Sequence, residues 1–190
     1  MNAAYTLAMM YYLGEEVPRD MEKAFHFFEI ASKKGHTMAR HYLAECYTFG
    51  QGVEQDFVQA AKWYEQAAEK NNLDSMINLG ICYNEGLGVE QNYEKALYWY
   101  NRAAEQNYAP AQYNIGLCYQ NGEGVEQNAT TAVEWLAKAA EQNLADAQYA
   151  LALCYLNGEG VEQNSDLAKE WMSKAADIGQ EEAKEALRQW

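Results

Sequence analysis

The heptapeptide Gly-Glu-Gly-Val-Glu-Gln-Asn at residues 122–128 decides the fold, because it recurs along the chain at a fixed interval. The same segment stands at residues 158–164, close variants stand at 50–56 and 86–92, and a weaker copy stands at 14–20. The valines of the five copies are spaced 36 residues apart without a slip. Self-similarity at such a period is typical of repeat proteins, in which each unit buries its apolar face against its neighbours.

Each copy of this loop lies between two helical patterns. Before the loop, residues such as Ile115, Gly116, Cys118 and Tyr119 recur on one face of a first helix. The loop glycines allow the left-handed backbone that ends this helix. After the loop, an Asp or Asn is suited to cap a second helix that carries a repeated Ala, Trp and Ala-Ala pattern. The expected caps are Asp20, Asp56, Asn92, Asn128 and Asn164.

The register predicts an all-α protein with a single domain over residues 1–190. We expect antiparallel helix pairs over about residues 3–34, 37–70, 74–106, 110–142 and 146–178, followed by a capping helix over 181–190. Arg188 stands in the small-residue column of this last helix, where it would prevent close packing of another unit. We therefore interpret the last helix as a cap.

The repeated pattern resembles the Sel1-like repeat, a relative of the tetratricopeptide repeat. In the fourth copy the residues that carry the resemblance are Ala111, Ile115, Gly116, Tyr119, Gly122, Gly124, Val125, Asn128, Ala132, Trp135, Ala139 and Ala140. The resemblance covers nearly the whole chain. It implies a right-handed α/α superhelical solenoid of about five 36-residue repeats, with the first helices on the concave side.

The charge balance narrows the class of partner. The chain has 14 Lys and Arg against 28 Asp and Glu, a net charge of −14. This balance disfavours nucleic acid and anionic membranes, because both attract clusters of basic residues. Part of the negative charge is periodic, as in the column of Glu54, Glu90, Glu126 and Glu162. Such a ridge either keeps the solenoid soluble or steers a basic partner.

Four cysteines, Cys46, Cys82, Cys118 and Cys154, occupy one column. Neighbouring helices pack about 10 Å apart, whereas a disulfide needs Cα atoms within about 7 Å. We therefore expect buried, unpaired thiols, which favour a reducing compartment. No signal peptide is evident at the start, so we expect a cytoplasmic protein, although a secreted or periplasmic parent stays open if the chain is a fragment.

Candidate catalytic and metal-binding residues are scarce. The three histidines, His26, His36 and His41, lack metal-ligand spacing. The chain has no Ser-x-x-Lys or Lys-Thr-Gly motif, and no His and carboxylate accompany its serines in repeat register. The loop glycines follow no strand, as a phosphate-binding loop would require. We expect no catalytic residue, no metal and no cofactor.

Each first helix also carries a set of residues, called the stripe below, on the face opposite the cysteine column. Ten of the fifteen stripe residues are apolar or aromatic, and none is Lys or Arg. Across the five copies the stripe consists of Tyr5, Met9 and Tyr12; His41, Glu45 and Thr48; Ile77, Ile81 and Asn84; Tyr113, Leu117 and Gln120; and Tyr149, Leu153 and Leu156. Two explanations stay open, namely a partner-binding surface or packing between repeats.

We expect a protein-interaction module without catalytic activity. Resemblance to tetratricopeptide repeats implies that the stripe, Thr48 aside, binds a peptide or helix in a concave groove. An apolar segment with basic residues fits the apolar stripe and the acidic edges best. The oligomeric state is open, and a monomer is the working expectation. The alternatives are a small-molecule-binding enzyme, such as a β-lactam-binding hydrolase, and a structural assembly subunit whose stripe is covered by a second copy.

Overall fold

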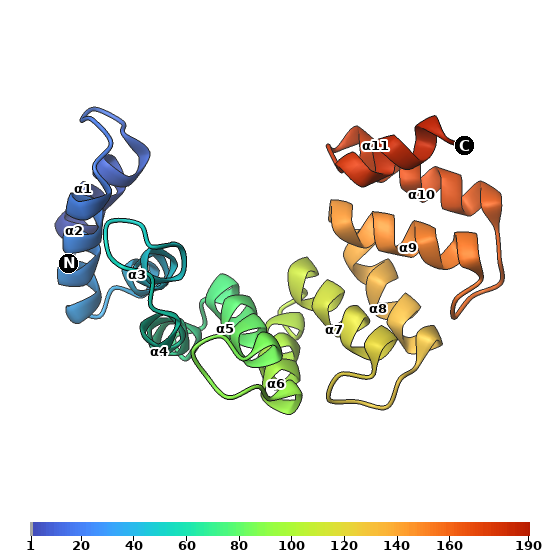
Figure 1. Cartoon of the computed structure of the whole chain (residues 1–190), viewed down its shortest axis with the longest axis horizontal. Helices are drawn as coiled ribbons and strands as arrows, with labels where there is room; N and C mark the ends of the chain where they lie inside the picture. The colour runs from blue at the N-terminus through green and yellow to red at the C-terminus, as the bar shows by residue number, and fades with distance from the viewer. Residues whose placement is uncertain (1) are drawn as a thin grey trace. The chain divides into compact units, whose positions relative to one another are not determined.

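The computed structural model describes residues 2–190, and in that range it contains eleven α-helices and no strand (Figure 1). The first helices of the five pairs are α1 (Asn2–Leu13), α3 (Thr37–Phe49), α5 (Leu73–Glu85), α7 (Ala109–Asn121) and α9 (Ala145–Asn157). The second helices are α2 (Met21–Lys33), α4 (Phe57–Ala68), α6 (Tyr93–Ala104), α8 (Ala129–Ala140) and α10 (Ser165–Asp177). The last helix, α11, spans Glu181–Arg188. None of these helices is long and apolar enough to cross a membrane.

The expected caps start the second helices. In every copy the side-chain oxygen of the Asp or Asn accepts a hydrogen bond from the backbone N–H three residues later, at 2.9–3.0 Å. The backbone N–H of the same residue donates to the carbonyl of a tyrosine near the end of the first helix, as Asn128 does to Tyr119. Each cap therefore joins the two helices of its own pair.

The turns between pairs contain a backbone feature that the sequence analysis missed. One residue per turn has a positive φ, between 57° and 103°. These residues are Gly35, Asn71, Asn107, Asn143 and Gly179. They form a column of period 36, and Asn is one of the few residues other than Gly that tolerate the left-handed region. The common backbone requirement explains why each of the five copies has either Gly or Asn there.

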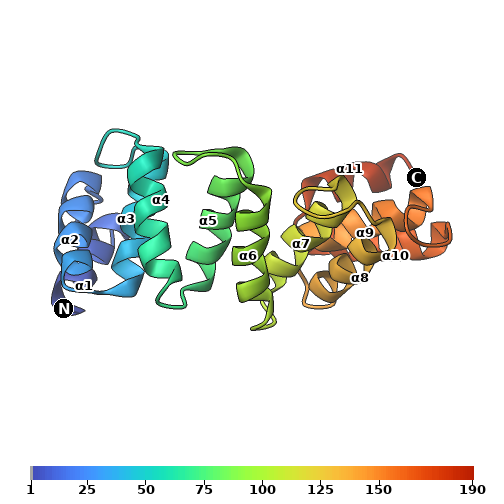
Figure 2. The same cartoon turned by 90° about the horizontal axis from the view of Figure 1, so that it is seen from below.

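The long loops touch the preceding pair through a glycine. A Cβ atom added to Gly52 would collide with the backbone carbonyl of Met21, where α2 begins. Gly88 stands in the same way against Phe57, and Gly160 against Ala129. Figure 2 shows the loops after α3 and α5 at the same end of their helices. A side chain at this loop position would therefore push neighbouring pairs apart.

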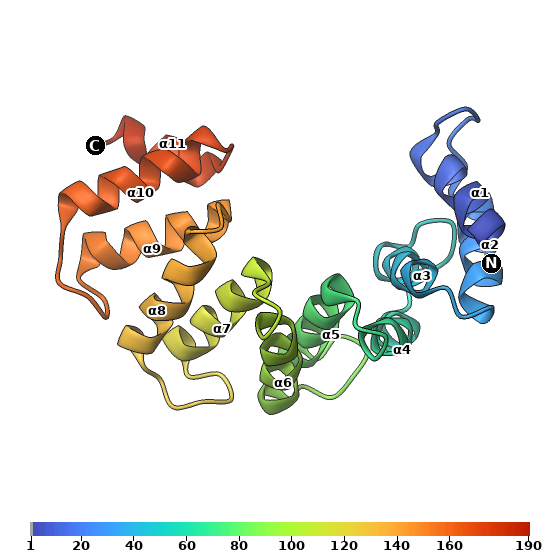
Figure 3. The same ribbon diagram turned by 180° about the vertical axis from the view of Figure 1, so that it is seen from behind.

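Contacts divide the chain into two compact units, one up to Trp99 and one from Tyr100, with the boundary inside α6. In unit 1, Phe28 and Leu43 belong to a buried core between α1, α2 and α3. In unit 2, Leu136 and Leu151 belong to the core between α8 and α9. A further core contains Met172 and joins α9, α10 and α11, with α10 lying between α9 and α11 (Figure 3).

Candidate functional site

The stripe lies partly covered on the first helices of both units. None of its fifteen residues is exposed, and two of them, His41 and Ile77, are buried. The other thirteen are half-buried. The stripe therefore packs against neighbouring helices and also keeps a limited accessible surface in both units.

In unit 1, the stripe residues of α1 pack within a cluster of aromatic rings. The ring of Tyr5 stacks on that of His36, with centroids 4.3 Å apart. The ring of Tyr12 contacts those of Phe28 and Tyr42, with centroid distances of 5.9 Å and 5.4 Å. These contacts hold α1 against α2 and α3. Packing thus accounts for much of the apolar surface of this copy.

The stripe residue His41 forms a buried polar network that the sequence analysis missed. Its Nδ1 lies 2.9 Å from Ser75 Oγ, and its Nε2 lies 3.5 Å from Glu45 Oε1. The three side chains come from α3 and α5 and are of the types found in a Ser-His-Glu triad, but the serine and the carboxylate lie at the opposite ring nitrogens from those of a catalytic triad. Ser75, however, is 0% exposed, so its hydroxyl cannot reach a substrate. The arrangement satisfies a buried histidine and offers no nucleophile to solvent.

The remaining stripe residues of unit 1 lie on α3 and α5. Thr48 Oγ1 donates to the carbonyl of Ala44 at 2.9 Å and contacts Tyr64 Oη at 3.2 Å. Ile81 is half-buried. Asn84 Oδ1 is buried and has no hydrogen-bond partner in the described part of the chain. This part of the stripe has neither a basic group nor a described hollow.

In unit 2, the stripe residues line a first hollow of about 360 Å³. Its lining comprises Tyr113, Leu117, Gln120, Asp146, Tyr149, Ala150, Leu153, Gln180 and Glu182. The apolar and aromatic side chains come from α7 and α9, whereas Gln180 and Glu182 stand at the start of α11. Burial, together with the negative charge of Asp146, raises the pKa of Tyr113. The phenol therefore stays protonated and available as a donor.

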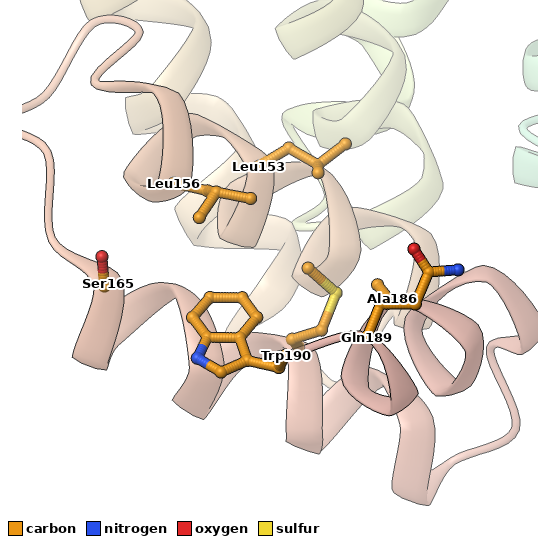
Figure 4. Close-up of a pocket in the computed structure, with 7 residues that line it drawn as sticks. Leu153, Leu156, Ser165, Ala186, Gln189 and Trp190 are labelled. Carbon is orange, nitrogen blue, oxygen red and sulfur yellow. The ribbon is translucent and has the colours of Figure 1, made fainter.

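A second hollow of about 460 Å³ adjoins the first and shares Leu153 with it. Figure 4 shows Leu153 and Leu156 on one side and Ala186, Gln189 and Trp190 on the other. Met172 and Ser165 of α10 complete the lining. Trp190 is 44% exposed, and Lys169 Nζ lies 5.7 Å from the centroid of its ring. The structure therefore brings Leu153 and Leu156 together with residues of α11 and of the segment after it, which the stripe did not include.

The loop glutamines are a further set that the sequence analysis did not interpret. Each donates through Nε2 to the backbone carbonyl of the last stripe residue in its copy, at 2.7–2.8 Å. The pairs are Gln55 with Thr48, Gln91 with Asn84, Gln127 with Gln120, and Gln163 with Leu156. Their recurrence in the Val-Glu-Gln segment of four copies is the sequence pattern that could have indicated a shared structural role. These bonds fix the end of the stripe to the loop.

The four cysteines are free and buried, as expected. Burial raises the pKa of Cys46 and Cys118 to about 12 and that of Cys82 and Cys154 to about 11. Because the thiolate is the reactive form, these side chains act as small apolar residues of the core.

The histidines do not form a metal site in the described residues. His36 caps α3 by accepting from the backbone N–H of Ala39 at 3.2 Å, and burial lowers its pKa. His26 is exposed on α2. Over residues 2–190 no group of three His, Cys, Asp or Glu side chains is placed to hold a metal ion.

The helix pairs, capped ends and 36-residue register define an α-solenoid of the kind used by helical repeat proteins. The family model of the Sel1 repeat matches residues 2–36, 37–72, 73–108, 109–144 and 145–180. The chain therefore belongs to the Sel1 repeat family. Proteins of this family are generally protein-interaction scaffolds that lack catalysis.

Solved structures agree with this assignment. A Sel1 repeat protein from Oxalobacter formigenes is 34% identical, with a TM-score of 0.92, and the match covers 96% of this chain and 72% of that one. The protective antigen c5321 of uropathogenic Escherichia coli is also 34% identical, with a TM-score of 0.87, over 96% of this chain and 39% of that one. The immunity protein Pa5087 of Pseudomonas aeruginosa, 22% identical with a TM-score of 0.63, covers 96% and 67% and shares the fold. A comparison with curated proteins gave no significant match.

Proposed function

We propose that the chain is a protein-interaction module that binds a peptide segment or helix of a partner protein through the stripe of unit 2. One observation carries this proposal. The side chains of Tyr113, Leu117, Tyr149, Leu153 and Leu156 are half-buried and line two adjoining hollows, so part of each stays accessible beside the core. Apolar anchors that enter such hollows are the usual source of affinity at interfaces.

Membership of a family of interaction scaffolds supports the same proposal. The hydrolase alternative receives no comparable support. Ser75, which lies beside His41 and through it near Glu45, is fully buried. We further propose that the ligand is a peptide segment with apolar or basic side chains.

The test uses random peptides displayed on phage and selected on the whole chain. Peptides that are enriched on the wild type are synthesised with a fluorescein label, and their affinity is measured by fluorescence anisotropy. Tyr113→Ala combined with Leu117→Ala should weaken binding by at least about tenfold, because truncating central apolar anchors commonly costs that much. Circular dichroism and thermal melting establish that the variant is folded.

A matched control truncates two exposed apolar residues away from the hollows. Phe49 and Val58 are 64% and 47% exposed, and neither lines a described hollow. Phe49→Ala combined with Val58→Ala should leave the affinity within a factor of about two. If the folded Tyr113 and Leu117 variant bound every enriched peptide as tightly as the wild type, the stripe of unit 2 would not be the binding site.

A further inference from the structure

The first hollow of unit 2 is negatively charged. Asp146 stands in the first turn of α9 and Glu182 in the first turn of α11, and both carboxylates are exposed to solvent. The lining contains no Lys or Arg, and neither carboxylate forms an ion pair in the described residues. Two negative charges without an ion-pair partner among residues 2–190 thus border the apolar lining of the first hollow.

The apolar lining of the first hollow is suited to the methylene groups of a Lys or Arg side chain. Leu117, Ala150 and Leu153 offer apolar surface, and Tyr113 and Tyr149 add two aromatic rings. Lys and Arg bury their methylene stems along such surfaces while the charged end stays near water. Aromatic rings also attract cations. A carboxylate ligand would instead be repelled by Asp146 and Glu182.

The second hollow has a different chemistry. Its lining includes Leu153, Leu156 and Trp190 and contains no Asp or Glu side chain (Figure 4). Lys169 stands beside it, over the ring of Trp190. The positive charge of Lys169 disfavours a second cation here, whereas an aliphatic or aromatic side chain can occupy the apolar lining.

Resting on the proposed function, we propose that unit 2 recognises a two-anchor motif in a partner peptide. A Lys or Arg occupies the first hollow between Asp146 and Glu182, and a large apolar side chain occupies the second hollow against Leu156 and Trp190. Both hollows share Leu153, and α11 borders them with Glu182 near its start and Trp190 just after its end. The motif therefore lies along α11.

The spacing of the two anchors follows from the length of this border. Glu182 and Trp190 are separated by eight positions in the sequence. The six helical steps from Glu182 to Arg188 rise about 9 Å at 1.5 Å per residue, and the two residues after α11 extend this to about 12 Å. An extended peptide covers about 3.3 Å per residue, so the two anchors should be about four residues apart.

The experiment determines the sequences of the enriched peptides in addition to whether they bind. Peptides selected on the wild-type chain should contain a Lys or Arg about four residues from a Leu, Ile, Met, Phe or Trp. For one such fluorescein-labelled peptide, Arg→Gln in the peptide should weaken binding about tenfold at low salt. Asp146→Asn combined with Glu182→Gln in the protein should have a similar effect, because each exposed ion pair contributes a factor of about two to five.

Two comparisons make the test specific. Glu134→Gln with Glu162→Gln changes the net charge equally, at exposed sites of unit 2 outside both hollows, and should alter affinity less than about twofold. The Arg→Gln peptide should lose no further affinity on the Asp146 and Glu182 variant, since the partner charge is already absent. Because both carboxylates stand in first helical turns, the melting temperature of the variant is measured in parallel.

The outcomes separate this inference from the proposed function. Enriched peptides that lack a basic residue but still depend on Tyr113 and Leu117 would overturn the two-anchor motif and leave the proposed function standing. Basic peptides that bind equally well to the Asp146 and Glu182 variant would also overturn the motif. If no peptide were enriched and light scattering showed a dimer that Leu153→Asp dissociates, the occupant would be a second copy, and both proposals would fail.

Discussion

The two units of the molecule use the same repeat position in different ways. His41 and Ile77 in unit 1 stand in the column that Tyr113 and Tyr149 occupy in unit 2. In unit 1 these side chains are buried, His41 between Ser75 and Glu45. In unit 2 they line a hollow beside two carboxylates. A common backbone register therefore does not dictate whether a column packs or remains available to a partner.

The largest expected effect concerns a contact that both units share, the loop glycine against the preceding second helix. Gly160→Ala should lower the free energy of unfolding by about 4 kcal/mol, because the new Cβ meets the backbone of Ala129 and φ is +71°. Gly179→Ala is the control, since φ is +103° there but nothing lies within 4 Å of the added Cβ. We expect a loss of about 1–2 kcal/mol for the control. Equal losses in urea unfolding would show that the loop contact is not tight.

The next effect tests the contrast between packing and availability. Ile77→Ala in unit 1 should destabilise the chain by about 3 kcal/mol, because Ile77 is 8% exposed and its truncation leaves a cavity. Leu117→Ala in unit 2 should cost only about 1 kcal/mol, since Leu117 is half-buried at the first hollow. Urea unfolding monitored by circular dichroism measures both. The contrast between the units would be wrong if Leu117→Ala proved as destabilising as Ile77→Ala.

The smallest effect concerns the cysteine column, in which the two units should behave alike. Burial raises the pKa of the Cys118 thiol to about 12, whereas a thiol in the unfolded chain ionises near about 8.5. Below the unfolded value both states keep the proton. Above it the unfolded state alone releases the proton, so stability falls as the pH rises towards the folded value.

For this one thiol the expected loss between pH 7.5 and 9.5 is about 1 kcal/mol. Urea unfolding at the two pH values measures it, and Cys118→Ala should remove that part of the pH dependence. Cys46→Ala gives the matching measurement in unit 1, where burial raises the pKa of Cys46 to the same value of about 12. A pH dependence that Cys118→Ala left unchanged would show that this thiol ionises equally in the folded and unfolded states.

Most of the fold could be predicted from local chemistry. The period of 36, the caps such as Asn128 and the loop glycines each specify backbone geometry within a few residues of themselves, and the structure confirms the helices and caps that they predict. The role of Asn71 in the positive-φ column was missed because its neighbouring copy has Gly35, and only the shared backbone requirement unites the two.

The candidate site could be predicted only in part. The stripe follows from helical periodicity, so Leu117 and Leu153 were found on it. Glu182 and Trp190 were not found, because Glu182 belongs to α11 and Trp190 follows it, and both reach the hollows through the packing of α11 beside α9 and α10. The Ser75 and His41 pair was missed for the same reason, as 34 residues separate its members in the chain. Periodicity describes one helix, whereas a hollow depends on several.

The glycine contact between neighbouring pairs has a consequence for how such a chain can change in length. Gly52, Gly88 and Gly160 meet the main chain of Met21, Phe57 and Ala129, three residues with little in common. This glycine contact therefore depends on the backbone of the preceding pair, whereas the rest of the boundary is a side-chain core such as that of Phe28 and Leu43. A shift of the sequence by a whole 36-residue segment would return a glycine to the same kind of backbone contact. A change in the number of repeats would therefore leave this contact unchanged while altering the side chains that the stripe presents.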